Sequence, residues 1–349
     1  MHRRPAWRNR DLPLRIASFI QRRLLFALPQ LVVVTIITFV MVRLLPGDPA
    51  YQLAGPYATA ETRQAMTARL GLDRPLWNQY LSYISDLAHG DLGQSWFTAR
   101  PVTHELLVRL PATLELVTFA MIIIVGGGLL LGLAVAVRGG GWIDRAATLY
   151  GRLAGAFPDF WLGLVLSYIF FFYLGWLPGP MGRLPIGADT PPTVTGFYTV
   201  DSLLAGDIPV FLAAIRQLVL PVATLVIVYM SGISKMAGTT IAEMLKSDMA
   251  QYARLCGLPE RTVLRYALRN SLPPVVTLIG LTYGFLLGGA VLVETVFAWG
   301  GMGQYVVASI GRSDYFPVQG FILVAAILNI IVYLVVDVVH LLIDPRIDY

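Results

Sequence analysis

Charged residues are scarce in this chain. Asp, Glu, Lys and Arg make up 13% of its 349 residues, whereas 56% are hydrophobic. Soluble domains carry about 25% charged residues, so a water-soluble core cannot bury this much apolar surface. The composition indicates a membrane protein. The net charge of +5 does not point to nucleic acid, because the basic residues stand between apolar runs rather than together on a soluble face.

Residues for disulfide, metal and catalytic chemistry are also few. The single cysteine, Cys256, excludes an intrachain disulfide and a cysteine-rich metal site. His104-Glu105 begins like a zinc-protease motif, but Val108 stands where the second histidine belongs. The chain has no G-x-x-x-x-G-K-S/T stretch for ATP phosphates. We therefore expect no catalytic residues, no metal and no cofactor bound by this chain.

Long apolar runs predict an all-α integral membrane fold of six transmembrane helices. Residues 1–23 are rich in arginine, and the run at 24–45 is too long for the apolar part of a cleavable signal peptide, so it predicts the first span. Residues 46–111 are polar, with helical patterns at 59–70 and 76–87, and predict an extracytoplasmic helical loop. The remaining core, residues 112–343, carries the other spans at 113–137, within 151–177, and at 217–236, 275–296 and 318–343, before a tail at 344–349.

The distribution of basic residues predicts the orientation. With an inside N-terminus, 17 of the 26 Lys and Arg residues fall on the inner side and seven in outer loops. Basic residues are enriched in cytoplasmic loops, so both termini are expected in the cytoplasm.

Glycine and polar residues within the spans have specific expected roles. Gly126, Gly127, Gly128 and Gly132 favour close helix packing over a hinge. Asp337 is expected to reach the inner interface or to pair with an arginine there. For Glu294, near the outer end of the fifth span, two roles stay open: a carboxylate that simply reaches the interface, or one that lines a path or contacts a binding protein.

A polar island separates the fourth and fifth spans. It reads DMAQYARLCGLPERTVLRYALRNSLPP from Asp248 to Pro274. The first half has an apolar stripe at helical spacing, Gly257 breaks the pattern, and Pro259 suits the first turn of a second helix. A basic loop held near anionic lipid headgroups is the simplest interpretation, but it requires neither the two helices nor the glycine between them.

This helix-glycine-helix stretch resembles the cytoplasmic coupling loop of ABC importer permeases. The resemblance is to the dipeptide, oligopeptide and nickel branch, and to the first of its two permeases. It extends over roughly residues 20–349, through LGLDRPLWNQY (70–80), GDLGQS (90–95), RLPATLEL (109–116) and LLGGAVLVETVFAWGGMG (286–303). Gln251-Tyr252-Ala253 stands where the family has Glu-Ala-Ala.

The resemblance implies a type I ABC importer permease fold and a role for each region. The loop at 243–272, called here the coupling segment, would dock on an ATPase subunit. Its expected coupling residues are Asp248, Gln251, Tyr252, Ala253, Arg254, Gly257 and Arg261. The fifth span would line the translocation route, which makes Gly288, Gly289 and Glu294 candidates for the path or for a binding-protein contact.

The resemblance also implies partners and a substrate. The expected partners are a second homologous permease, two ABC ATPases that bind ATP and Mg²⁺, an extracytoplasmic substrate-binding protein and membrane lipid, in the bacterial plasma (inner) membrane. The expected function is a pore-forming subunit that imports di- or oligopeptides, with nickel as the alternative. An ion-driven secondary transporter is the alternative from another class, although the chain lacks a convincing internal repeat and midplane charges.

Overall fold

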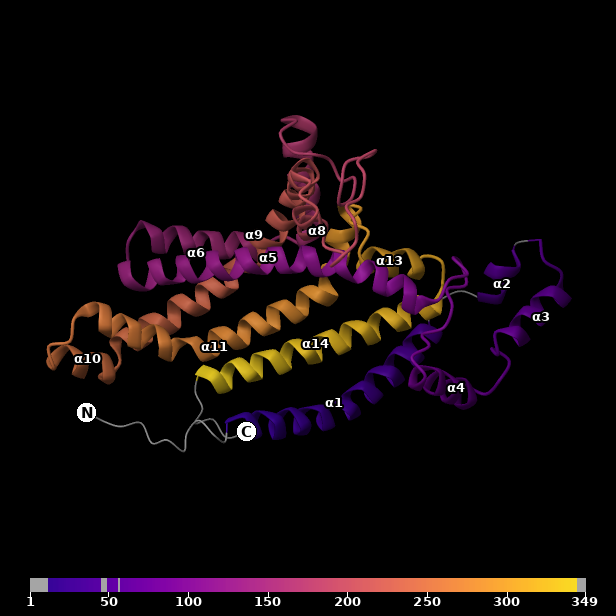
Figure 1. Ribbon diagram of the computed structural model, residues 1–349, viewed down its shortest axis with the longest axis horizontal. Helices are drawn as coiled ribbons and strands as arrows, with labels where there is room; N and C mark the ends of the chain where they lie inside the picture. The colour runs from indigo at the N-terminus through magenta and orange to yellow at the C-terminus, as the bar shows by residue number, and fades with distance from the viewer. Residues whose placement is uncertain (1–11, 45–48, 56, 344–349) are drawn as a thin grey trace.

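Five long helices form the body of the molecule, which is seen in a computed structural model that describes residues 12–44, 49–55 and 57–343. They lie side by side as an elongated bundle, and α14 packs against both α1 and α11 (Figure 1). Each is long and apolar enough to cross a membrane. They are α1 (Leu12–Arg43), α5 (Val102–Arg138), α9 (Ile208–Lys246), α11 (Glu260–Gly289) and α14 (Tyr315–Ile343).

The sixth candidate span is a bent pair of helices. α6 (Trp142–Ala154) is followed by α7 (Asp159–Ser167) and the π-helical turn η2 (Tyr168–Tyr173), and the two parts meet at 101°. The single third span predicted within residues 151–177 is therefore divided, with a break at residues 155–158. Pro158 disfavours helical geometry at the residue before it, which explains why the chain turns at this point.

Short helices occupy the two ends of the bundle. One end carries α2 (Pro49–Ala54), α3 (Ala60–Arg69), α4 (Leu76–Ala88) and α13 (Met302–Ile310), and the opposite end carries α10 (Asp248–Leu255) (Figure 1). We call these the α4 end and the α10 end. The helices predicted at 59–70 and 76–87 correspond to α3 and α4. The remaining short helices are α8 (Tyr198–Leu204) and α12 (Val291–Val296).

Two predicted helix boundaries at prolines were wrong. α5 continues through Pro111, and α11 continues through Pro273 and Pro274, so the second helix of the coupling segment and the fifth span are one helix. A proline inside a helix removes a backbone hydrogen bond, but neighbouring helices can satisfy the freed groups. The carbonyls freed by Pro273 and Pro274 are those of Arg269 and Asn270, one turn earlier, and α14 packs against this stretch, where Nε2 of His340 lies 3.1 Å from the carbonyl oxygen of Pro273 itself.

The glycines of α5 allow a close contact with α9. A Cβ atom on Gly132 would lie 2.7 Å from the carbonyl oxygen of Ser234 on α9, and one on Gly128 would lie 2.8 Å from Ile233. Gly127 faces Met230 in the same way, whereas Gly126 has no neighbour within 4 Å. The expected packing role is confirmed for three of the four glycines, and Gly126 takes no part in it.

The two terminal spans are joined by an ion pair. Arg23 on α1 lies 2.9 Å from Asp337 on α14, which confirms that Asp337 pairs with an arginine. The pair holds a carboxylate that would be costly in hydrocarbon if it were alone. Residues 1–11 of the predicted N-terminal segment and the predicted tail at 344–349 lie outside the described residues.

The glycine contact predicts opposite effects for one substitution at two positions. Gly132→Ala is expected to lower the free energy of unfolding by about 1–3 kcal/mol because the new methyl group pushes α5 from α9. Gly126→Ala should leave stability unchanged or raise it, since alanine is the better helix former. Thermal unfolding of the purified protein in detergent measures both, and equal shifts for the two variants would contradict the packing assignment.

Candidate functional site

The α10 end carries a tightly built helix-turn-helix. Ser247 precedes α10, and its side chain accepts a hydrogen bond from the N–H of Ala250. Gly257 ends the helix with φ +73°, a left-handed conformation that glycine adopts easily. The N–H groups of Gly257 and Leu258 bond to the carbonyls of Arg254 and Ala253, at 2.9 and 3.1 Å. This is the Schellman arrangement, and it aims the chain directly into α11.

Arg254, on α10, bonds to the two helices that flank it. Its Nε donates to Oε1 of Glu260 at 2.8 Å, and its NH1 group donates to the carbonyl of Leu245, at the end of α9, at 3.0 Å. Beneath this contact Ala250, Ala253 and Val263 form a small buried cluster. The turn is therefore preorganised by contacts within this chain.

The opposite face of α10 is apolar and uncovered. Tyr252 is 69% exposed and Leu255 is 86% exposed, and Met249 lies partly exposed beside them. Exposed apolar patches of this kind mark interaction sites. Of the predicted coupling residues, Asp248, Gln251 and Arg261 are also exposed, whereas Ala253 is buried and Gly257 forms the turn.

At the α4 end, Glu294 is enclosed. It is only 1% exposed, so it does not reach an interface. Its Oε1 accepts from Oγ1 of Thr113 on α5 at 2.6 Å, and its Oε2 accepts from the N–H of Gln304 at 3.1 Å. A Cβ atom on Gly301 would collide with this carboxylate. The glycines after Glu294 thus give the carboxylate its space, and the group joins α12, α13 and α5.

The two predicted glycines lie apart from Glu294, beside an open groove. Gly288 and Gly289 line a cavity of about 730 Å³ with Tyr229, Phe285, Asn329 and Tyr333, at the junction of α9, α11 and α14. No atom lies within 4 Å of a Cβ built on Gly288, so its backbone faces open space. The groove is mostly apolar, and its polar side chains are the amide of Asn329, the phenols of Tyr229 and Tyr333 and the hydroxyl of Thr282.

Two further carboxylates organise the α4 end, and sequence reasoning missed both. Glu115, on α5, is buried and accepts from NH2 of Arg183 at 2.5 Å and from the N–H of Thr199 at 2.9 Å. The guanidinium of Arg183 also lies 3.6 Å from the ring centre of Tyr198. These contacts hold the loop after η2 against α5. The partners are 68 and 84 residues from Glu115, so no local pattern could have revealed them.

Asp201, on α8, holds the same loop from the other side. It accepts from the N–H groups of Val194, Thr195 and Gly196 and from the Thr195 hydroxyl, at 2.7 to 3.2 Å. Burial alone raises the pKa of Asp201, but these four hydrogen bonds to the ionised form outweigh it and hold the pKa below its ordinary value.

Two family models match the chain. "Binding-protein-dependent transport system inner membrane component" matches residues 128–349, and the corresponding N-terminal model matches residues 16–117. The chain belongs to this family. Because the match begins in α1 and ends with the tail, it includes the coupling turn, the groove and the enclosed Glu294.

Curated relatives cover nearly the whole chain. A probable D,D-dipeptide transport system permease protein of Escherichia coli K12 is 44% identical over 90% of this chain and 92% of its own length. A di/tripeptide transport system permease protein of Pseudomonas aeruginosa is 42% identical over 95% and 99%. A glutathione transport system permease protein of Salmonella choleraesuis is 36% identical over 95% and 99%.

The geometry of this permease-family chain divides its predicted site residues into two groups. The coupling residues gather at the α10 end, and Gly288, Gly289 and Glu294 lie near the other end of α11 and in α12. One continuous helix joins the groups, because α11 begins at the coupling turn and ends at the groove (Figure 1). The assignment of single residues to docking or to the path stays a prediction.

Asp201 predicts an acid-sensitive loop. Asp201→Asn should cost about 2 kcal/mol at neutral pH, because an amide cannot accept all four hydrogen bonds. The contribution of a carboxylate with a lowered pKa is complete above its unfolded pKa of about 3.9 and is lost as the pH falls through the folded pKa. Unfolding temperatures measured from pH 7 downward should therefore converge for the wild type and the variant below about pH 4. A constant difference at every pH would contradict this account of Asp201.

Proposed function

We propose that this chain is the pore-forming permease subunit of an ATP-driven importer of di- or oligopeptides. The observation that carries the proposal is the near full-length similarity to relatives named as dipeptide and di/tripeptide permeases. These names favour peptides over nickel as the cargo. A groove of about 730 Å³ falls within the range of 300–1,000 Å³ usual for small-molecule sites.

Energy for transport enters at the α10 end, which we place in the cytoplasm. Basic residues are concentrated at this end of the spans, as the positive-inside rule requires. The exposed Tyr252 and Leu255 seat α10 in an ATPase subunit, and ATP and Mg²⁺ bind in two such subunits. When the ATPases close, α10 moves with them, and the Arg254 contacts pass that motion to α9 and α11.

The α4 end faces the extracytoplasmic binding protein, and a second related permease completes the pore in the bacterial inner membrane. The groove beside Gly288 is open in the isolated chain, with its floor on α11 and α14. A second permease packed over it would close the groove into a path. Selectivity then rests mainly with the binding protein, since the groove offers few polar groups.

The intramembrane and enclosed acids favour ATP over an ion gradient as the energy source. Asp337 is paired with Arg23, and Glu294 is bonded to Thr113 and to the Gln304 backbone. Beside the groove, Asp159 accepts from the hydroxyl of the groove residue Tyr229 at 3.0 Å and from the N–H of Phe160 at 2.7 Å. None of these three acids is therefore left without a partner, whereas an ion-coupled transporter needs a group that exchanges its ion.

The function is tested by hydrolysis of ATP in the assembled importer. The chain is purified with its second permease and ATPases in lipid nanodiscs, and hydrolysis is measured with binding protein that carries either a dipeptide or Ni²⁺. We expect the dipeptide-loaded protein to stimulate hydrolysis. Stimulation by the nickel-loaded form alone would replace peptides by nickel, and a chain that never co-purifies with an ATPase would overturn the proposal.

The exposed face of α10 gives a sharper prediction. Replacing both Tyr252 and Leu255 by serine removes apolar contacts worth a few kcal/mol at an interface, so stimulated hydrolysis should fall at least about tenfold. Leu204→Ser, at a leucine on α8 that is 64% exposed against 86% for Leu255, is the control and should retain activity. Equal rates in both variants would show that α10 does not dock on the ATPase.

A further inference from the structure

The helix α4 has an apolar side that is wider than its contact with the bundle. At about 100° per residue, exposed polar residues such as Asn78 and Asp86 fall on the other side. On the apolar side Tyr83 is buried, but Trp77 is 66% exposed and Leu81 is 48% exposed. Four residues of this side, one half-buried and three exposed, recur at helical spacing. We call them the α4 stripe: Trp77, Leu81, Ile84 and Ala88.

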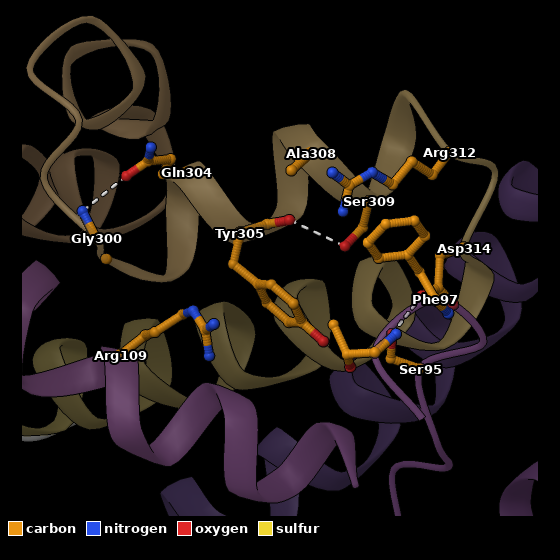
Figure 2. Close-up of a pocket in the computed structure, with 12 residues that line it drawn as sticks. Ser95, Phe97, Arg109, Gly300, Gln304, Tyr305, Ala308, Ser309, Arg312 and Asp314 are labelled. Carbon is orange, nitrogen blue, oxygen red and sulfur yellow. Dashed lines mark hydrogen bonds between the residues drawn. The ribbon is translucent and has the colours of Figure 1, made fainter. Parts of the chain in front are cut away.

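Contacts with α1 and with the chain after α13 hold α4 in place. Oε1 of Gln79 accepts from Nε of Arg43, the last residue of α1, at 2.9 Å. A few residues beyond the end of α4, the hydroxyl of Ser95 donates to Oδ2 of Asp314 at 2.5 Å (Figure 2). In Figure 1, α4 lies beside the end of α1, at the edge of the bundle. The stripe is therefore held in one position on the outside of the bundle.

The contact with α1 gives the depth of α4 in the membrane. Arg23 and Arg43 flank the apolar part of α1, and the 20 residues between their positions correspond to about 30 Å, the thickness of the hydrocarbon core. The hydroxyl of Tyr80 lies 3.1 Å from Oγ1 of Thr35 on α1. Thr35 stands about 12 Å along the helix from Arg43. One side of α4 thus reaches the level of the acyl chains.

The stripe adjoins apolar surface that α1 presents to lipid. Ile36 and Val40 of α1 come directly after the contact residues Thr35 and Phe39 and are exposed. The groove that a second permease would close lies among α9, α11 and α14, and α14 packs against both α11 and α1 (Figure 1). Closing the groove therefore does not require contact with α4. A tryptophan among aliphatic residues is also typical of helices at the lipid interface.

We propose that α4 is an interfacial helix whose stripe is inserted among the lipid acyl chains of the outer leaflet. Such helices bury their apolar face about 5–10 Å into the boundary between headgroups and acyl chains, which agrees with the level of the Tyr80 contact. The inference goes beyond the proposed function. It requires only that α1 spans the membrane, and the proposed orientation decides which leaflet α4 enters. Part of the predicted extracytoplasmic loop then belongs to the membrane surface and ties this end of the bundle to it.

The test uses spin labels at single introduced cysteines in a Cys256→Ser chain, within the complete importer in nanodiscs of phosphatidylethanolamine and phosphatidylglycerol. Power saturation compares collisions with oxygen, which concentrates in lipid, and with a water-soluble nickel chelate. Leu81→Cys, on the stripe, should report a depth of about 5–10 Å. Asp86→Cys, on the opposite side of α4, is the matched control and should report water. Val33→Cys, at an exposed position of α1, gives the signal of the bilayer interior.

A second measurement leaves the chain unlabelled. Lipids brominated near the top of their acyl chains quench tryptophan fluorescence on contact. The fluorescence that is lost in Trp77→Phe should be quenched in such lipids. The fluorescence that is lost in Trp299→Phe should not be quenched, because Trp299 is buried within the chain. Trp77→Phe keeps an aromatic ring in the stripe and is therefore expected to leave α4 in place.

The outcomes distinguish lipid from water and from protein at the stripe. If the labels at 81 and 86 both report water and the Trp77 fluorescence is unquenched, α4 stands above the membrane and the proposal is wrong. If the label at 81 is shielded from oxygen and from the chelate alike, protein covers the stripe and the assignment to lipid is overturned. ATP hydrolysis is followed in the same samples: a lack of stimulation by binding protein would overturn the proposed function but not the insertion of α4.

Discussion

The continuity of α11 as a single helix is the constraint on which the proposed mechanism depends. The helix runs from Glu260, beside the coupling turn, to Gly289, beside the groove. Two consecutive prolines remove two backbone donors from its middle. α14 packs along the helix at this point, where Nε2 of His340 lies 3.1 Å from the Pro273 carbonyl and 3.3 Å from Oγ1 of Thr277. A displacement at one end is therefore carried to the other rather than absorbed at a flexible joint.

The α4 end is built on a different principle, in which buried carboxylates join segments that are distant in sequence. Glu115 binds Arg183, Glu294 binds Thr113, and Asp314 binds the loop of Ser95. Each carboxylate is satisfied by N–H or O–H donors, which makes its burial tolerable. This end therefore forms a fixed platform.

Much of the architecture was predictable because it follows from local patterns. Apolar runs located the five long spans, although only the ends at Arg43, Arg138, Tyr315 and Ile343 fall within three residues of the predicted ones, and Gly257 with Pro259 predicted the turn between α10 and α11. The packing of Gly132 and the pairing of Asp337 were also predicted. Glycines on one face of a membrane helix favour close helix packing, and an acid within a span needs a partner or an interface.

The other features of the fold and of the site could not be predicted from the sequence, because they depend on tertiary contacts. Pro111 and Pro273 predict helix ends locally, and only the packing of neighbouring helices shows why the helices continue. The bent third span, the enclosure of Glu294 and the partners of Glu115 join residues whose separation in sequence carries no signal. For the coupling turn the sequence identified the segment, but the structure alone separates the exposed Tyr252 from the buried Ala253.

The most direct test of this account is the distance between spin labels at residues 265 and 281, on either side of the two prolines. Because Cys256 is the chain's single cysteine, a Cys256→Ser background allows specific labelling. At a rise of 1.5 Å per residue the two positions lie about 24 Å apart in an intact helix. We predict the same distance in the nucleotide-free and ATP-bound importer, measured by double electron-electron resonance. A change of several ångströms between the states would show a hinge at the prolines and would contradict transmission through α11.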